Sequence, residues 1–419
     1  MPSVSRNKPS KKVIDALTFD LPKKHDQLNK ASNAPLTLTY TFDSAGIGGL
    51  DTGYSGWQSF SAGQKAAVEA VLAEYETFLN VRFVASAGGG DKDLYFGRTN
   101  LGSLDGFGGI SWKKTASSFD LDGFAMWDTS VSFSGTYAQH LLVHEIGHAM
   151  TLKHPGRYGS DEEGPFLKKS KESNKFSVMS YKDNPDSGEL AAHLMLYDVA
   201  ALQKRFGANL EHRTGDDVYT GPAGPLEVLW DAGGTDIIDG SGYTTRVKID
   251  LRDGRFSSLG EKANLAIAFG AVIENATGGS GSDKLVGNRW KNVLSGGPGD
   301  DRIDGGKGSD ILAGGPGADV FVFSAKPGKG RDTITDLQPG VDIIRLDRDD
   351  FARIGGKGTL KDGKFHLGSE AHDKSDRIVY DDQSGHLIHD RNGSGPGKAK
   401  VFAVVDAGLD IGHELFIVA

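Results

Sequence analysis

The sequence predicts an α+β domain followed by an all-β domain built from short stacked turns. Three observations lead to this prediction. The chain has 419 residues, which exceeds a single comfortable core, so two domains are expected. Helix and strand patterns occur in mixed order as far as residue 214. From residue 215 onward, paired glycines and single apolar residues recur every nine residues, which is typical of a solenoid.

The composition excludes several classes of protein. Lys and Arg number 47 against 56 Asp and Glu, and the net charge of −9 argues against a general nucleic-acid binder, whose surface would be basic. Cysteine is absent, so the chain cannot use disulfides. No stretch approaches the roughly 18 consecutive apolar residues that a membrane span needs. The N-terminus also lacks the apolar run of a secretory signal peptide.

The first domain is assigned to residues 31–214, after a flexible tail at residues 1–30. The tail carries many basic residues and little apolar periodicity. Within the domain, alternation of apolar and polar residues predicts strands, and apolar stripes with a period of 3.6 predict helices. The strands are expected at 36–42, 81–86 and 93–97, and the helices at 61–80, 136–150 and 196–206.

The second domain is assigned to residues 215–344 because of its repeat. Five contiguous rows run from Gly278 to Val322, and they read GGSGSDKLV, GNRWKNVLS, GGPGDDRID, GGKGSDILA and GGPGADVFV. Weaker rows flank them at 231–239 and 327–335. Each row has one inward-facing apolar residue, so stacking must supply the core. A disordered Gly-rich linker is the alternative, and the strict phasing of Asp and apolar positions argues against it.

The sixth position of the rows predicts calcium. Stacked turns would place an Asp of each coil in register with the next, where like charges repel, and a hard cation between the turns would remove that repulsion. Two rows per coil put Asp283, Asp301 and Asp319 on one side, so we expect more complete ion sites there than on the side of Asn292. The predicted calcium ligands are Asp236, Asp283, Asp301, Asp310, Asp319 and Asp332.

The stretch LLVHEIGHAMTLKHPG at 141–156 predicts a second kind of metal site. His144 and His148 lie four residues apart on an expected helix, so both rings leave one face. Neutral imidazoles at that spacing suit Zn²⁺, and the adjacent Glu145 could act on a water held by the metal. With the third histidine, His154, this spacing would arise by chance in roughly 3 of 10,000 such chains. Zinc is favoured because the ligands are nitrogens and the chain has no thiolates.

These motifs resemble those of a known family. H-E-x-x-H-x-x-G-x-x-H followed by a Met-turn is the metzincin pattern, and this chain has HEIGHAMTLKH and later SVMSY. The nine-residue rows resemble the parallel β-roll of RTX proteins. Together, over about residues 35–340, the chain resembles the serralysins, which are secreted bacterial zinc endopeptidases. The fold that this resemblance implies is an α+β metzincin-like catalytic domain followed by an all-β parallel β-roll (RTX) domain.

The resemblance implies roles for individual residues. It predicts a zinc metalloendopeptidase that acts on protein or peptide substrates, with segment 123–133 as the edge strand along which a substrate would lie. The implied site consists of zinc ligands at His144, His148 and His154, a general base at Glu145, an apolar floor at Met179, and Tyr181, which would ligate zinc at rest and stabilise the tetrahedral intermediate.

One position departs from the metzincin pattern. The glycine that bends the chain toward the third histidine is replaced by Thr151, and a β-branched residue at positive φ costs on the order of 1–3 kcal/mol. Zinc affinity in model peptides is larger, around 10 kcal/mol or more, so we expect His154 to bind with the turn relaxed. The alternative is a catalytically impaired calcium-binding RTX surface or matrix protein that retains a metzincin fold.

The last segment bears on export. Residues 345–419 do not continue the rows, and alternating segments around QSG and NGSG turns predict a β-rich cap on the solenoid. The ending GHELFIVA resembles the uncleaved C-terminal signal of type I secretion, which predicts a secreted, extracellular bacterial protein and makes residues 1–30 a short pro-segment. The type I secretion machinery would then be a partner of a monomeric protein, and a small protein inhibitor is a further candidate partner.

Overall fold

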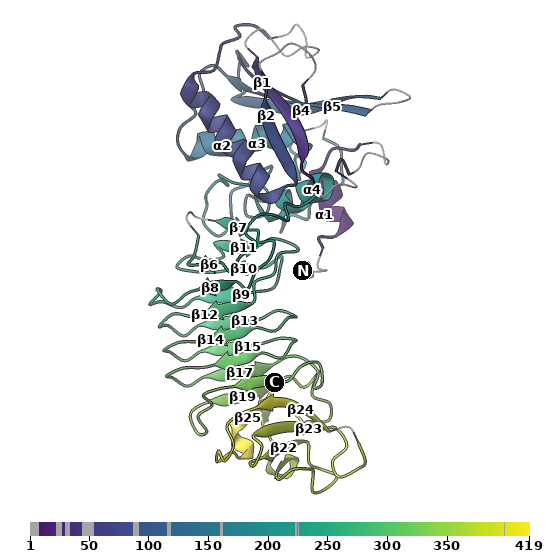
Figure 1. The fold of residues 1–419 in the computed structure, drawn as a ribbon, viewed down its shortest axis with the longest axis vertical. Coiled ribbons are helices and arrows are strands. Elements are labelled where there is room, and N and C mark those ends of the chain that lie inside the picture. Colours follow the sequence, from purple (N-terminus) through teal and green to yellow (C-terminus); the bar gives the residue numbers. More distant parts are fainter. Residues whose placement is uncertain are drawn as a thin grey trace.

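The computed structural model describes residues 8–21, 27–29, 34–43, 54–86, 92–114, 119–159, 162–222, 224, 226–397 and 399–419. The molecule is elongated. An α+β region occupies one end, two columns of short strands form the middle, and a β-rich cap closes the other end (Figure 1). Within these ranges, no helix has both the length and the apolar character that crossing a membrane requires.

A five-stranded sheet forms the centre of the α+β region, with the strand order β2-β1-β3-β5-β4. β1, β2, β3 and β5 pair in parallel, and β4 pairs antiparallel with β5. The strands are Leu36–Asp43 (β1), Val81–Ala85 (β2), Leu94–Thr99 (β3), Gly106–Lys114 (β4) and Phe119–Asp128 (β5). The expectation that 123–133 forms a free edge is therefore wrong. Its first residues lie in β5, between β3 and β4, and β4 is the edge strand.

Three helices of the α+β region lie where the sequence predicts them. Their bounds are Ala62–Phe78 (α2), Thr136–Ala149 (α3) and Leu196–Phe206 (α4). Ser61 and Gln64 form a capping box that starts α2. Gly207 has a φ of 83° and ends α4. α3 packs against β4 and β5, and this contact brings its inner face to the open edge of the sheet.

The N-terminal segment contains a short helix, α1, at Lys11–Leu17. It packs against α4, and both Ala16 and Leu17 are completely buried. The flexible tail expected for residues 1–30 therefore does not describe this part of the chain, because a few apolar side chains anchor it to the domain. The remaining residues of that tail at 1–7, 22–26 and 30 lie outside the described ranges.

The repeat forms two facing columns of short parallel strands. Leu285 pairs with Ile303 and Ile303 with Phe321, so each coil contains two nine-residue rows, as predicted. One column contains Val218–Tyr219 (β6), Ile237–Asp239 (β8), Asn275–Thr277 (β12), Val293–Ser295 (β14), Ile311–Ala313 (β16) and Asp332–Ile334 (β18). The other contains Lys248–Asp250 (β9), Lys284–Val286 (β13), Arg302–Asp304 (β15), Val320–Phe323 (β17) and Ile343–Leu346 (β19). A small sheet beside the α+β region is formed by Glu227–Leu229 (β7), Phe256–Ser257 (β10) and Leu265–Ile267 (β11).

The C-terminal segment extends both columns and forms the cap. Its elements are Gly358–Thr359 (β20), Asp362–Lys364 (η2), Phe365–Leu367 (β21), Ile378–Asp381 (β22), His386–Asp390 (β23), Ala399–Val404 (β24), His413–Leu415 (η3) and Phe416–Val418 (β25). β22, β23 and β24 form the antiparallel hairpins that the sequence predicts. β24 pairs in parallel with β18 and β25 with β19, so the last strand of the chain is built into the roll.

Candidate metal centre

α3 carries two of the histidines on its buried inner face. His144 and His148 are one turn apart, and both side chains are buried. Gly147 lies between them and allows a neighbouring segment to come very close, because a Cβ at this position would lie 2.7 Å from Sδ of Met179. Met179 is itself fully buried. The predicted apolar floor therefore lies directly against the helix that carries the two histidines.

A tight turn after α3 brings the third histidine to the other two. Thr151 has a φ of 77° and is fully buried, and its hydroxyl has no hydrogen-bond partner among the described residues. Despite this strain, Nε2 of His154 lies 3.2 Å from Nε2 of His144 and 3.1 Å from Nε2 of His148. The sequence pattern therefore delivers three ring nitrogens to one point without the usual glycine.

The other ring nitrogen of each histidine contacts an acceptor. The Nδ1 partners are the Val178 carbonyl for His144, the Leu152 carbonyl for His148 and Oε1 of Glu162 for His154, at 3.0, 2.9 and 2.8 Å. An acceptor at Nδ1 requires the hydrogen to be on that nitrogen, which leaves the Nε2 lone pairs free to converge. This arrangement is common around metal-binding histidines, and three neutral imidazoles fit Zn²⁺.

Burial keeps these rings neutral. Desolvation, together with the neighbouring His154 ring, lowers the pKa of His148 to about 3. Burial also lowers the pKa of His144 well below its usual value. The pKa of His154 is lowered by burial, which the carboxylate of Glu162 opposes. All three side chains are therefore in the protonation state that a cation needs.

Glu145 lies beside the histidines, between α3 and β4. A Cβ at Gly106 would lie 2.8 Å from Oε1 of Glu145, and a Cβ at Gly108 would lie 2.5 Å from its carbonyl oxygen. The glycines of β4 thus let the edge strand approach the helix closely. Burial raises the pKa of Glu145 to about 8, so this carboxyl group can accept and release a proton near neutral pH.

Asp198 holds the segment that carries Met179. Its Oδ1 accepts a hydrogen bond from Oγ of Ser177 at 2.6 Å, and its Oδ2 accepts one from the backbone N–H of Val178 at 2.7 Å. Asp198 belongs to the first turn of α4 and is fully buried. Since the Val178 carbonyl orients His144, α4 and α3 position this ring together.

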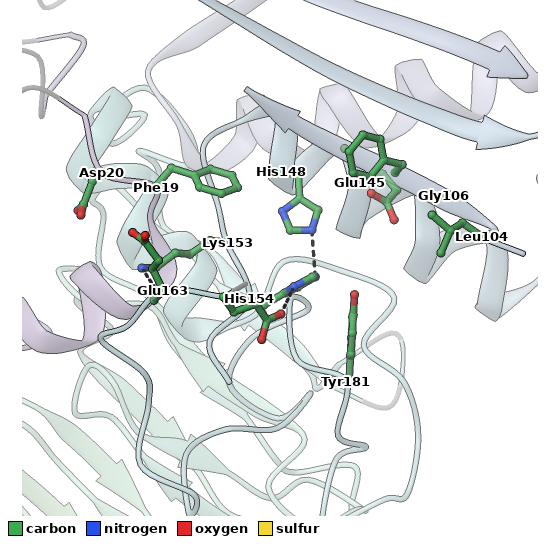
Figure 2. Close-up of a pocket in the computed structure, with 13 residues that line it drawn as sticks. Phe19, Asp20, Leu104, Gly106, Glu145, His148, Lys153, His154, Glu163 and Tyr181 are labelled. Atoms are coloured by element: carbon green, nitrogen blue, oxygen red, sulfur yellow. Dashed lines mark hydrogen bonds and ion pairs between the residues drawn. The ribbon is translucent and has the colours of Figure 1, made fainter. Parts of the chain in front are cut away.

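Tyr181 lies over the site from the opposite side and is more than half exposed. Its ring centroid is 4.5 Å from that of His154, and it stacks on Tyr158 at 4.4 Å with an interplanar angle of 23°. The backbone N–H of Tyr181 donates to the Tyr158 hydroxyl at 3.2 Å. Figure 2 shows the Tyr181 hydroxyl directed toward Glu145 and His148.

These groups line one cleft of about 480 Å³. The sequence singled out four of its lining residues, which are Glu145, His148, His154 and Tyr181. Figure 2 shows the others around them, with Leu104 and Gly106 at one end and Phe19, Asp20, Lys153 and Glu163 at the other. Phe107, Gly108 and Glu162 complete the lining. The only sequence feature that could have indicated the part of the lining formed by β4 is its pair of adjacent glycines, which permit a close approach to a neighbouring segment.

Comparisons with known proteins agree with the geometry. Residues 210–358 match the family model described as the serralysin C-terminal region of the M10 peptidases. Metallopeptidase AprA of Pseudomonas marginalis is 38% identical over 353 residues, which cover 75% of this chain and 74% of that protein. The chain belongs to the serralysin family.

Other relatives show the same degree of similarity. Serralysin G of Dickeya chrysanthemi is 38% identical over 74% of this chain and 72% of its own length. Metalloprotease AprA of Pseudomonas entomophila is 36% identical over 76% of this chain and 73% of its own length. Among solved structures, an extracellular lipase from Serratia marcescens aligns with 49% of this chain and 37% of its own at 19% identity. Its TM-score of 0.18 is too low to support any argument.

In this serralysin-family chain the aspartates of the repeat form a ladder along each column of the roll. Oδ1 of Asp301 accepts a hydrogen bond from the backbone N–H of Asp283 at 2.8 Å, and Oδ1 of Asp319 accepts one from that of Asp301 at 2.8 Å. On the other side, Oδ1 of Asp310 accepts one from Asn292 at 2.9 Å. One carboxylate oxygen therefore ties each coil to the next.

The second oxygen of several of these carboxylates is buried without a hydrogen-bond partner in the described part of the chain. Burial, with nearby carboxylates, raises the pKa of Asp310 to about 8 and that of Asp301 and Asp319 to about 6. An unpartnered buried carboxylate oxygen is costly, so this set of donors fits a hard cation such as Ca²⁺. The unpartnered Oδ2 atoms are those of Asp236, Asp301, Asp310 and Asp319.

Glycines at the first position of the rows leave space beside these oxygens. A Cβ at Gly296 would overlap Oδ2 of Asp301, and a Cβ at Gly314 would overlap Oδ2 of Asp319. The row of Asn292 differs, because its amide is already fully used: Oδ1 accepts from Asn288 at 2.8 Å and Nδ2 donates to the Glu274 carbonyl at 2.8 Å. The expected difference between the two sides of the roll stays a prediction, because both oxygens of Asp283 also accept backbone hydrogen bonds, whereas Asp310 on the side of Asn292 retains an unpartnered oxygen among the described residues.

A further carboxylate group lies where the roll meets the α+β region. Asp217, Asp231 and Asp236 place one oxygen each within 4.8 Å of one another. Burial, followed by the charges of Asp231 and Glu274, raises the pKa of Asp236 to about 7. The sequence identified Asp236 through its row at 231–239, but Asp217 lies outside the rows and Asp231 is at the first position of that row, where the five contiguous rows have glycine, so these two could be found only from the structure.

Proposed function

We propose that this chain is a zinc-dependent endopeptidase that hydrolyses peptide bonds of protein substrates. The observation that carries the proposal is the convergence of three histidines beside a buried carboxyl group in an open cleft: Nε2 of His154 lies within 3.2 Å of Nε2 of both His144 and His148. The names of the relatives support it, since they are described as metallopeptidases and serralysins. His144, His148 and His154 would hold the zinc, which supplies Lewis acidity when bound.

Glu145, Tyr181 and strand β4 would each have a separate role in the reaction. Glu145, which lines the cleft beside His148 and His154, would take a proton from the attacking water and later pass it to the leaving amine. The Tyr181 hydroxyl, directed into the cleft, would donate a hydrogen bond to the oxygen that becomes negative in the transition state. β4 would receive the peptide along its free edge, with the backbone groups of an exposed strand as partners.

Casein cleavage tests this function. The full-length protein is assayed with zinc and calcium present, and the wild type is compared with Glu145→Ala and with Glu69→Ala, a change at an exposed residue of α2 that does not line the cleft. We expect the wild type and Glu69→Ala to cleave and Glu145→Ala to be inactive while it still binds zinc. Absence of cleavage by the wild type in a calcium-folded, zinc-loaded sample would contradict the proposal.

The catalytically impaired alternative depended on Thr151. The turn at this residue still brings Nε2 of His154 within 3.2 Å of the other two histidines. The presence of threonine in place of glycine therefore gives that alternative no geometric support. Glu145 and Tyr181 also line the same cleft. An active enzyme is therefore the function that this site supports best.

Calcium binding by the roll is the second part of the proposal. Support comes from the unpartnered Oδ2 atoms and from the raised pKa values of the aspartates that carry them. The proposed ligands remain Asp236, Asp283, Asp301, Asp310, Asp319 and Asp332. Far-UV circular dichroism during a Ca²⁺ titration tests this point, and strand content that is the same with and without calcium would refute it.

Export by a type I system completes the proposal and accounts for a chain without disulfides. The proposed signal at Glu414–Ala419 includes β25, whose residues Phe416 and Val418 are buried in the roll. Recognition would therefore precede folding. A test that does not disturb the roll is to fuse residues 400–419 to a carrier protein and to measure its export from a competent host. A carrier that stays in the cells would contradict the signal.

A further inference from the structure

The N-terminal segment forms a two-stranded pairing with the turn that carries the metal ligands. Thr18 and Leu152 form an antiparallel bridge. The backbone N–H of Phe19 donates to the Thr151 carbonyl at 3.0 Å, and that of Lys153 donates to the Leu17 carbonyl at 2.9 Å. The residues between His148 and His154 thus obtain part of their backbone hydrogen bonding from a segment far away in the sequence.

This pairing acts on a turn that is under strain. Thr151 is held at positive φ with an unpartnered hydroxyl, and Leu152 supplies the carbonyl that orients the ring of His148. If residues 17–19 were absent, the Thr151 carbonyl and the Lys153 N–H would lose their partners. Buried backbone groups without partners are unfavourable, so the turn would rearrange and take Leu152 and His154 with it.

The segment is itself firmly anchored. Ala16 and Leu17 are completely buried, and α1 packs against α4. The Arg205 side chain, buried in α4, donates to the Phe19 carbonyl at 2.8 Å. This anchor joins the segment to the same helix that holds the Met179 segment through Asp198.

The segment also forms part of the cleft. Phe19 and Asp20 line it opposite Leu104 and Gly106, and the Phe19 ring centroid lies 6.1 Å from that of His148 (Figure 2). Asp20 lies near Lys153, whose Nζ donates to the Glu163 carbonyl at 3.0 Å. A substrate side chain entering this end of the cleft would therefore meet an aromatic ring and a charged rim.

We propose that residues 11–20 remain in the active enzyme, where the backbone of residues 17–19 clamps the turn from Thr151 to Lys153 and where Phe19 forms one wall of the substrate cleft. This inference rests on the proposed peptidase function for its substrate part. It replaces the expectation that residues 1–30 are removed as a pro-segment. Phe19 is a positioning residue through its N–H and a substrate-contacting residue through its ring.

Two substitutions at one position separate these roles. Phe19→Pro removes the N–H that donates to Thr151, and we expect it to raise the zinc dissociation constant about tenfold or more, as loss of a ligand-supporting contact does. Phe19→Ala keeps the N–H and removes the ring, so we expect KM to rise while zinc affinity stays unchanged. Lys12→Ala, on the exposed face of α1, is the control and should change neither quantity.

The intact mass of the zinc-loaded protein after prolonged incubation under assay conditions decides whether the segment is retained. A stable active product that begins beyond residue 20 would overturn the proposal. So would a Phe19→Pro variant that binds zinc as tightly as the wild type, or a Phe19→Ala variant with unchanged KM. Zinc affinity is measured without substrate, so a wild type that fails to cleave casein would refute the proposed function and leave the clamp testable. If Phe19→Pro does not fold, the intact mass still tests whether the segment is retained, and Phe19→Ala still tests whether its ring forms a wall of the substrate cleft.

Discussion

Oε1 of Glu162 lies 2.8 Å from Nδ1 of His154, and Oε2 of the same carboxylate accepts a hydrogen bond from the backbone N–H of Gly159 at 3.1 Å. The third histidine is thus oriented by a charged side chain, whereas the other two are oriented by backbone carbonyls. This contact adds to the strained turn at Thr151 in fixing the position of His154. The carboxylate therefore stabilises the ring position that the missing glycine would otherwise help to reach.

Replacing Glu162 should weaken zinc binding. We expect Glu162→Ala to raise the zinc dissociation constant roughly ten- to a hundredfold, because the Nδ1 hydrogen bond is lost, and Glu162→Gln to have a smaller effect because its amide oxygen can still accept. Competition titration against a chelating dye measures both. Glu189→Ala, on an exposed loop, serves as the control. Equal zinc affinity of wild type and Glu162→Ala would show that the contact does not support the ligand.

Thr151→Gly should stabilise the zinc-loaded protein. Glycine removes the conformational penalty at φ 77° and the buried unpartnered hydroxyl. It also raises the conformational entropy of the unfolded chain, which is destabilising but smaller. We therefore expect a net gain of about 1 kcal/mol in the free energy of unfolding. Thr151→Ala removes the hydroxyl but keeps most of the backbone strain, so its free energy of unfolding should lie between those of the wild type and Thr151→Gly. Urea denaturation in the presence of zinc and calcium measures the order. A loss of stability in Thr151→Gly would mean that the threonine methyl group contributes packing that outweighs the strain.

Gly106→Ala should reduce turnover without removing zinc. The new Cβ would lie 2.8 Å from both Cγ and Oε1 of Glu145, so the whole side chain would have to shift and the carboxylate would move with it. A misplaced proton acceptor lowers kcat by on the order of tenfold to a hundredfold. Gly63→Ala is a matched control on α2, where a Cβ meets no neighbouring atom. Steady-state kinetics with a measured zinc content provides the test, and an unchanged kcat in Gly106→Ala would argue against this placement of Glu145.

Gly296→Ala should weaken calcium binding by the roll. Its Cβ would overlap Oδ2 of Asp301, the oxygen proposed to face the cation, and we expect a loss of about 1–3 kcal/mol in stability with calcium present. Gly242→Ala places its Cβ in open space within the same domain and is the control. Isothermal titration with Ca²⁺ measures the calcium affinity, and thermal unfolding measures the loss of stability. If both variants bind calcium alike, the space beside Asp301 is not needed for the ion.

His193 should titrate above its usual pKa of 6.5. Nδ1 of His193 lies 2.9 Å from Oε2 of Glu74, and this hydrogen bond raises the pKa of His193. Since the folded-state pKa lies above the unfolded one, the pair stabilises the fold fully below the unfolded pKa, and this contribution is lost as pH rises through the folded pKa. NMR titration should show the raised midpoint in the wild type and a lower one in Glu74→Gln. Glu69→Gln on the same helix should leave it unchanged, and a wild-type midpoint at or below 6.5 would contradict the pairing.

The sequence was sufficient where a period or a spacing carries the information. The helix of His144 and His148 follows from its four-residue spacing, and the coils of the roll follow from the phase of residues such as Leu285 and Ile303. β4 could not be predicted, because its glycines break the alternation that identifies strands, and they are present for the close approach to Glu145. Its position at the sheet edge likewise depends on long-range pairing rather than on any local pattern.

The remaining parts of the site depend on contacts between distant segments. Phe19 reaches the cleft only because α1 packs on α4, and nothing in the basic N-terminal stretch signals that contact. Glu162 lies in a loop without periodicity, and its role becomes visible only when the turn at Thr151 places His154 beside it. Pairwise geometry of this kind has no signature in a single sequence.

The aspartate ladder has a direction. In every rung described above, the donating amide belongs to the coil nearer the α+β region and the accepting carboxylate to the coil that follows it in the chain, up to Asp319 N–H and Oδ1 of Asp342. Backbone hydrogen bonds between the same coils run the other way, since the N–H of Arg302 donates to the Asp283 carbonyl and that of Val320 to the Asp301 carbonyl. Each coil therefore both donates to and accepts from its neighbour, so the loss of one coil would leave backbone groups without partners on the coils at either side of it.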